Sequence, residues 1–248
     1  MERLDWLTAR PIAHRGLHDA ASHVIENTAG AVSRAIDGQY GIEVDLQITA
    51  DGEAVVYHDD ALGRLTDGSG RLADLTAAEL VRVPFKATDD RIMPLGDLCD
   101  LVAGRVTLLL EMKSHFDGDP RLPQRIATVL HGYAGPVAAM SFDPQQVLDL
   151  RRAAPRLTRG MTAQARWRDH DAEPSSGASR SGLARLGDVL RMQPQFIAYS
   201  VADLPAAVPL VARSLLGLPL LTWTVRSEAD RARAARWADQ MIFEGFRP

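Results

Sequence analysis

The chain has 248 residues, 46% of them hydrophobic, and its 28 basic and 32 acidic residues give a net charge of −4. This length is enough for a sizeable core, and we expect residues 1–248 to form a single domain. The slightly acidic balance and the lack of a long basic run argue against nucleic acid as a partner. The single cysteine, Cys99, leaves no intrachain disulfide and is typical of a reducing compartment.

The hydropathy pattern predicts no targeting or membrane segment. The N-terminal residues, MERLDWLTARP, alternate charged with apolar side chains and do not resemble a secretory signal. The most apolar stretch, residues 208–223, contains Arg213 and Pro219 and is too short to span a bilayer. We therefore expect a soluble, cytoplasmic protein without stable membrane insertion.

Short apolar runs recur along the chain, and each is separated from the next by a stretch typical of a helix. In chain order the runs are PIAHRG, YGIEVDLQIT, RVTLLLEMK, VAAMSF, TRGMTA, FIAYSV, LLTWTV and QMIFEG. Each is short and apolar enough for a buried parallel strand. Eight alternations of strand and helix predict the α/β class and a closed (β/α)₈ TIM barrel. An open doubly wound sheet is the alternative, but no G-x-G-x-x-G pattern follows the first run.

Helix-start signals stand between several of these runs. Such signals combine a capping side chain with a proline or an acidic residue in the first turn. They are Asn27 or Thr28 before AGAVSRAID, Thr76 with Glu79, Asp143 before Pro144, and Ser227 before EADRARAARWA.

One segment departs from the barrel pattern. Asp51-Gly52 lies between YGIEVDLQIT and AVVYHDD and is a strong hairpin signal. Because a hairpin return is antiparallel, AVVYHDD is not a further barrel strand, and it brings His58 back toward the strand that carries Glu43 and Asp45. Residues 62 to about 92 then form a small insertion. The polar, turn-rich stretch that begins at Arg166 is predicted to be a mobile loop.

Carboxylates lie at the ends of two predicted strands. Residues i and i+2 share one face of a strand, so Glu43 and Asp45 point the same way, as do Glu111 and Lys113. In a barrel these strand ends face the mouth, where catalytic sites form. Three carboxylates gathered there would protonate, pair with cations or bind a hard ion such as Mg²⁺ or Ca²⁺. Taken singly, each motif is more ordinary as a solvated strand end.

The opening run ends in His14, Arg15 and Gly16, where glycine suits a sharp turn or the close approach of a ligand. The further motifs are Glu26-Asn27-Thr28, Glu43-Val44-Asp45, Asp51-Gly52, Val56-Tyr57-His58-Asp59, Glu111-Met112-Lys113, Ser141-Phe142 and Trp223-Thr224-Val225. In this order, with Leu62, Arg64, Thr66 and Gly68 after the histidine, they resemble the glycerophosphodiester phosphodiesterase family. The resemblance covers essentially the whole chain and is densest from Pro11 to Gly70. It implies a TIM barrel with an insertion near the second strand, here a short one.

The resemblance also implies an activity. Members hydrolyse glycerophosphodiesters such as glycerophosphocholine to glycerol 3-phosphate and an alcohol, with one divalent cation, Mg²⁺ or Ca²⁺. By correspondence, His14 and His58 are the catalytic acid/base pair. The corresponding metal ligands are Glu43, Asp45 and Glu111, and the substrate-binding residues are Arg15 and Lys113 on the phosphate side and Trp223 beside the glycerol.

Two alternatives stay open. A lysophospholipase D-like enzyme would use the same site on lysophospholipids, and a non-catalytic phosphate-binding barrel would keep only the scaffold. The last strand also departs from the family's I-T-D-R-P ending, because Glu244 lies between Phe243 and Phe246. Either the aromatics cover the barrel exterior and Glu244 is solvated, or Glu244 faces the mouth and favours a cationic alcohol.

Overall fold

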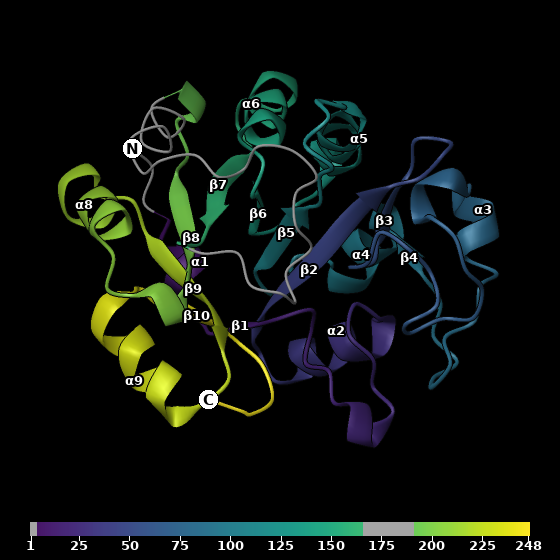
Figure 1. Cartoon of the computed structure of the whole chain (residues 1–248), viewed down its shortest axis with the longest axis horizontal. Coiled ribbons are helices and arrows are strands. Elements are labelled where there is room, and N and C mark those ends of the chain that lie inside the picture. The colour runs from purple at the N-terminus through teal and green to yellow at the C-terminus, as the bar shows by residue number, and fades with distance from the viewer. Residues whose placement is uncertain (1–3, 166–190) are drawn as a thin grey trace.

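The computed structural model describes residues 4–165 and 191–248, and its parallel strands close into a barrel surrounded by helices (Figure 1). The barrel strands are β1 (Ile12–Ala13), β2 (Gly41–Ile48), β5 (Leu108–Met112), β6 (Val137–Ser141), β7 (Thr158–Ala163), β8 (Phe196–Ser200), β9 (Leu220–Val225) and β10 (Gln240–Phe243). Neighbours in this order are hydrogen-bonded in parallel, and β1 pairs with both β2 and β10, which closes the ring. The predicted (β/α)₈ barrel and its eight strands are confirmed.

Helices begin at the predicted capping residues. Each of three helices has a capping side chain that accepts a hydrogen bond from a backbone N–H of the first turn. These caps are Thr28 for α2 (Ala29–Asp37), Asp143 for α6 (Pro144–Ala153) and Ser227 for α9 (Glu228–Trp237). Thr76 and Glu79 form a complete capping box at α3 (Ala77–Leu80). Each cap satisfies backbone donors that a helix start leaves open. The other described helices are α1 (Asp5–Thr8), α4 (Leu95–Val102), α5 (Arg121–Val129) and α8 (Ala207–Leu216), with 3₁₀ turns at 20–22, 72–74, 130–132 and 201–203.

Side chains of the barrel strands alternate between two apolar layers. Inward-facing residues, among them Ile12, Leu109, Phe196, Leu221 and Ile242, fill the barrel interior together with Leu4 and Leu7. Outward-facing residues form a larger core against α2, α4, α5 and α6. Because the interior is packed with apolar side chains, polar chemistry is confined to the carboxyl ends of the strands. Side chains two residues apart on a strand share a face. The residues that follow the inward-facing Ile12, Leu109, Leu221 and Ile242 by two positions therefore face the same way, and they are His14, Glu111, Trp223 and Glu244.

The predicted hairpin is confirmed. β3 (Ala54–Val56) runs antiparallel to β2, with Leu46 opposite Val56, and β4 (Met93–Pro94) pairs antiparallel with β3. The Tyr57 N–H donates to the Asp45 carbonyl at 3.0 Å, which places the next residue, His58, beside the middle of β2, near Asp45. The insertion that follows lies at the side of the barrel with α3 (Figure 1) and has its own apolar core, which includes Leu72 and Ile92.

Three further expectations concern the stretch from Arg166 on, membrane-spanning segments and the single cysteine. The polar stretch that begins at Arg166 lies outside the described residues. Within the described ranges, no helix is long and apolar enough to cross a membrane. Cys99 is a free, buried thiol on α4, and burial raises its pKa to about 11.

Candidate active site

Three carboxylates meet on the neighbouring strands β2 and β5, near the point where their parallel pairing ends at Leu46 and Met112. Glu43, Asp45 and Glu111 each place one oxygen within 4.8 Å of the others, and all three residues are buried. Parallel pairing puts Asp45 opposite Glu111 in register, and the two-residue alternation puts Glu43 on the same face as Asp45. The structure thus brings together the carboxylates that the sequence places on one barrel rim.

Two cations lie against these carboxylates. The Lys113 Nζ atom is 2.9 Å from Asp45 Oδ1 and 2.8 Å from Glu111 Oε1. The Arg15 Nε atom is 3.2 Å from Asp45 Oδ2, and the Arg15 backbone N–H donates to Glu43 Oε2 at 3.0 Å. Burial works to lower the pKa of both cations, but the carboxylate charges outweigh it and raise the pKa of each. Arg15 and Lys113 are therefore permanently charged at this site.

Three carboxylates against two cations leave one negative charge uncompensated. Burial, followed by repulsion from Asp45 and Glu111, raises the pKa of Glu43 well above its ordinary value. Burial acts in the same sense on Asp45, but the charges of Lys113 and His58 outweigh it and hold the Asp45 pKa well below its ordinary value. A proton on Glu43 thus supplies positive charge that the protein lacks there. Oxygen-only donors with a deficit of positive charge fit a hard divalent cation.

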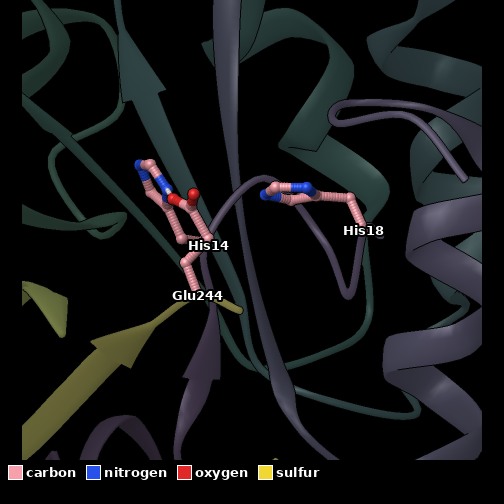
Figure 2. A group of neighbouring side chains, drawn as sticks. All are labelled: His14, His18 and Glu244. Atoms are coloured by element: carbon pink, nitrogen blue, oxygen red, sulfur yellow. Dashed lines mark hydrogen bonds and ion pairs between the residues drawn. The ribbon is translucent and has the colours of Figure 1, made fainter. Parts of the chain in front are cut away.

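Both predicted catalytic histidines hydrogen bond to a carboxylate through Nδ1. In His14 this nitrogen lies 2.7 Å from Glu244 Oε2 (Figure 2). The other ring nitrogen of His14, Nε2, lies 4.0 Å from Glu43 Oε2. In His58 the Nδ1 atom lies 2.8 Å from Asp59 Oδ1. A ring held by Nδ1 presents its Nε2 for chemistry. For His14 that nitrogen faces the carboxylate cluster.

Glu244 lies between an imidazole and a guanidinium. Its Oε2 is also 2.9 Å from Arg226 Nη2. Burial works to raise the Glu244 pKa, but the hydrogen bond and charge of His14, with Arg226, hold it well below its ordinary value. Burial lowers the pKa of His14, and the hydrogen bond to Glu244 offsets part of this.

The C-terminal strand combines the two expectations for its side chains. Phe243 is buried outside the barrel against Tyr40, with ring centroids 5.0 Å apart, which agrees with the expectation that the aromatic side chains cover the barrel exterior. Glu244 faces the mouth, which agrees with the other expectation, but its charge is engaged by His14 and Arg226. The geometry therefore gives Glu244 a direct connection to His14 rather than a free charge for a head group.

A second layer of polar residues holds the site. Glu26 Oε1 lies 2.8 Å from Arg15 Nη1 and 2.7 Å from Arg64 Nη2. The Asn27 side chain donates to Asp45 Oδ2 at 2.8 Å, and its Oδ1 accepts from the Asp45 backbone N–H at 3.2 Å. Glu26, Asn27 and Arg64 all belong to the sequence motifs, but the only role predicted for any of them is that of Asn27 as a candidate helix cap, a position that Thr28 takes. The sequence signal that could have indicated a site role is the adjacent polar pair Glu26-Asn27, which lies between the apolar Ile25 and the helix cap Thr28.

Gly16 has a structural reason that needs no ligand. Its φ is +79°, and a Cβ atom there would lie 2.8 Å from the Ala31 Cβ atom. Only glycine therefore allows the chain to turn after β1 and pack against α2. The sharp-turn expectation is the one that the structure supports.

Trp223 stands at the carboxyl end of β9 and is partly buried. Its ring packs edge-to-face on Phe142, with centroids 5.4 Å apart and planes at 84°. Phe142 appears in the sequence motifs without a role, and the structure packs it against Trp223.

The chain is similar in sequence to known proteins. Residues 14–246 match the sequence profile of the glycerophosphoryl diester phosphodiesterase family. The chain is 31% identical over 163 residues to a glycerophosphodiester phosphodiesterase of Caldanaerobacter subterraneus subsp. tengcongensis, which covers 62% of this chain and 66% of that protein. It is 31% identical over 162 residues to glycerophosphodiester phosphodiesterase 1 of Mus musculus, which covers 61% and 48%. The chain thus spans less than two thirds of the length of these relatives.

Solved structures share the fold. An Oleispira antarctica phosphodiesterase, solved in complex with the product sn-glycerol-3-phosphate, superposes with a TM-score of 0.77 at 20% identity, over 96% of this chain and 94% of that one. At this identity the likeness establishes the barrel architecture.

Proposed function

Because this chain belongs to the glycerophosphoryl diester phosphodiesterase family, we propose that it hydrolyses glycerophosphodiesters to glycerol 3-phosphate and an alcohol. The observation that carries this proposal is the convergence of three carboxylates, two cations and a carboxylate-held histidine at one end of the barrel. The product named for the Oleispira antarctica phosphodiesterase supports the same substrate class. On this proposal residues 1–248 act as a single catalytic domain.

Glu43, Asp45 and Glu111 would hold one divalent cation, Mg²⁺ or Ca²⁺, since both prefer carboxylate oxygens. With two cationic side chains present, a divalent ion would change the local charge from one negative to one positive. That charge complements the single negative charge of a phosphodiester. The bound ion would polarise a phosphoryl oxygen as a Lewis acid.

Arg15 and Lys113 bind the phosphate in different ways. The planar Arg15 guanidinium suits two phosphate oxygens at once, whereas Lys113 acts as a point charge. Glu26 bonds to Nη1 of Arg15 and Asp45 lies beside Nε, which fixes the plane of the guanidinium. Arg15 is therefore oriented before the substrate arrives.

His14 and His58 divide the proton transfers. One takes the proton of the attacking hydroxyl, which is either water or the glycerol 2-hydroxyl, and the other protonates the leaving alcohol oxygen. Glu244 and Asp59 keep each Nδ1 engaged, so Nε2 carries the transferred proton, and their charge stabilises the imidazolium. Trp223 and Phe142 provide an apolar wall for the glycerol side.

A panel of substrates tests the proposal. Glycerophosphocholine, glycerophosphoethanolamine and glycerophosphoinositol are incubated with the chain in Mg²⁺, Ca²⁺ or EDTA, and products are identified by phosphorus NMR. Glycerol 3-phosphate should form from at least one substrate, and EDTA should abolish its formation. Release of a phosphorylated alcohol instead of glycerol 3-phosphate, or no turnover under any condition, would contradict the proposal.

The lysophospholipase D-like alternative receives less support from the surface. Among residues 4–165 and 191–248, the most exposed large apolar side chain is that of Leu215. It lies with Leu216 near the end of α8, a few residues before β9 begins at Leu220. These side chains therefore lie toward the amino ends of the strands, away from the carboxylate cluster. Adding lysophosphatidylcholine to the panel tests this ranking, because faster release of choline from it would reverse the order.

A further inference from the structure

A third histidine, His18, faces the His14–Glu244 pair. Figure 2 shows its ring directed toward that pair from the loop after β1. One ligand atom from each of His14, His18 and Glu244 lies within 4.8 Å of the other two. The parallel pairing of β1 with β10 brings the first and last strands together, so residues from both ends of the chain meet here.

The Nε2 atom of His18 is enclosed without a partner. Its exposed surface is negligible, and no atom of the described residues lies at hydrogen-bonding distance and angle. Enclosed polar nitrogens are nearly always hydrogen-bonded, because leaving them unpaired costs free energy. An imidazole nitrogen in this setting, directed at another imidazole and a carboxylate, is placed as a metal ligand would be.

We propose that His14, His18 and Glu244 form a second metal site, distinct from the carboxylate cluster, and that its ion is Zn²⁺. Two imidazole nitrogens and one carboxylate oxygen are a donor set that zinc uses, with the fourth position left to water. The cluster of Glu43, Asp45 and Glu111 offers only oxygen and suits Mg²⁺ or Ca²⁺. Ligand chemistry therefore separates the two sites.

The required movements are small. Zinc bonds of about 2.0–2.2 Å place tetrahedral ligand atoms about 3.3 Å apart. The His14 Nδ1 and Glu244 Oε2 atoms are 2.7 Å apart, so zinc would replace the hydrogen between them with slight widening. His18 lies within 4.8 Å and closes the remainder by side-chain rotation. Arg226, whose side chain is 54% exposed, can leave Glu244 Oε2 for solvent.

Zinc in this site would inhibit the proposed hydrolysis, a consequence that rests on the proposed function. Zinc on Nδ1 keeps the remaining ring proton on Nε2, and the ring can no longer form imidazolium. His14 would then be unable to accept a proton as a base and would be a poor donor as an acid. The inhibition therefore holds whichever of the two roles His14 has.

Zinc titration of the Mg²⁺-saturated chain tests the site. Calorimetry should show one zinc bound per chain, and activity measured in parallel should fall at least about tenfold at saturation. His18→Ala removes one ligand and should raise the zinc concentrations for half-saturation and half-inhibition at least about tenfold. Basal activity with Mg²⁺ should not change, because His18 has no part in the proposed reaction. His131→Ala, an exposed histidine in the 130–132 turn, is the matched control and should behave as wild type.

Two outcomes would overturn the proposal. One is equal zinc affinity of wild type and His18→Ala, and the other is competitive displacement of zinc by Mg²⁺, which would put zinc on the carboxylate cluster. His18→Gln repeats the test if His18→Ala has a lowered unfolding midpoint. Binding of Co²⁺, followed by its visible absorption with nitrogen ligands, reports the site without turnover. A chain that binds zinc through His18 but hydrolyses nothing would therefore count against the proposed function alone.

Discussion

The two Nδ1-anchored histidines are the side chains on which turnover should depend most. His14→Ala and His58→Ala should each lower kcat by about 10²- to 10⁴-fold, with a much smaller effect on KM, because proton transfer occurs in the transition state. Steady-state kinetics with glycerophosphocholine measure both constants, and His131→Ala serves as control. A variant that keeps the wild-type kcat would show that its histidine has no proton-transfer role.

Glu244 should act on rate rather than on head-group choice. Its carboxylate holds His14 Nδ1 and is engaged by Arg226, so little charge is left for a distant alcohol. Glu244→Gln should lower kcat about 10- to 100-fold, equivalent to a charge-assisted hydrogen bond of about 1.5–3 kcal/mol. The ratio of kcat/KM for glycerophosphocholine to that for glycerophosphoinositol should stay constant. A ratio that moves toward inositol in the variant would restore the head-group role considered from the sequence.

At the scale of elements, the β2–β3 hairpin positions His58, and its turn depends on Gly52. The φ of Gly52 is +81°, and a Cβ atom there would meet nothing within 4 Å, so only backbone strain opposes a side chain. Gly52→Ala should therefore lower the free energy of unfolding by about 1 kcal/mol. Gly96→Ala is the matched control, because this α4 glycine has equally open surroundings without a positive φ. That substitution should stabilise the chain by about 0.4–1 kcal/mol.

Urea unfolding of both variants measures the difference. If Gly52→Ala were as stable as Gly96→Ala, the turn would tolerate a side chain and the hairpin would not depend on glycine. The activity of Gly52→Ala should fall below that of Gly96→Ala only if the changed turn displaces His58.

Local signals in the sequence were sufficient for the elements. The eight apolar runs, the caps at Thr28, Asp143 and Ser227, and the Asp51-Gly52 turn each act within a few residues, and all are found in the structure. The two-residue alternation also placed Glu43 and Asp45 on one face. The link from Glu244 to His14 spans 230 residues and depends on the register between β10 and β1. Arg226 reaches Glu244 from beyond the end of β9, where no periodic pattern indicates a direction.

At the scale of the whole molecule, the charge balance of the barrel mouth links stability to pH. The pKa of Glu43 is raised above its ordinary 4.5. At pH values between 4.5 and the folded-state pKa, the folded metal-free chain therefore binds a proton there that the unfolded chain has released. Such a group contributes stability below its unfolded pKa, and this stability is lost as pH rises through the folded pKa. Glu244, with a lowered pKa, contributes in the opposite sense, since its stabilisation is present above 4.5 and is lost in acid.

Glu43→Gln tests the first contribution, because titrating groups outside the carboxylate cluster affect both proteins alike. Without metal at about pH 8, the variant should be more stable than wild type by on the order of 1 kcal/mol, since it removes a buried charge without a full set of counter-charges. Near pH 4, where Glu43 is protonated in both the folded and the unfolded chain, the difference should largely disappear. Excess Mg²⁺ or Ca²⁺ should reverse the order at the higher pH, because a ligand at about 100 times its Kd adds about 2.7 kcal/mol to the protein that binds it. Urea unfolding in EDTA and in each cation measures the three differences, with the exposed Glu228→Gln as control. Equal stabilisation of wild type and Glu43→Gln by the cation would place the ion elsewhere. If wild type were as stable as the variant at high pH in EDTA, Arg15 and Lys113 would already balance the charge of the carboxylate cluster.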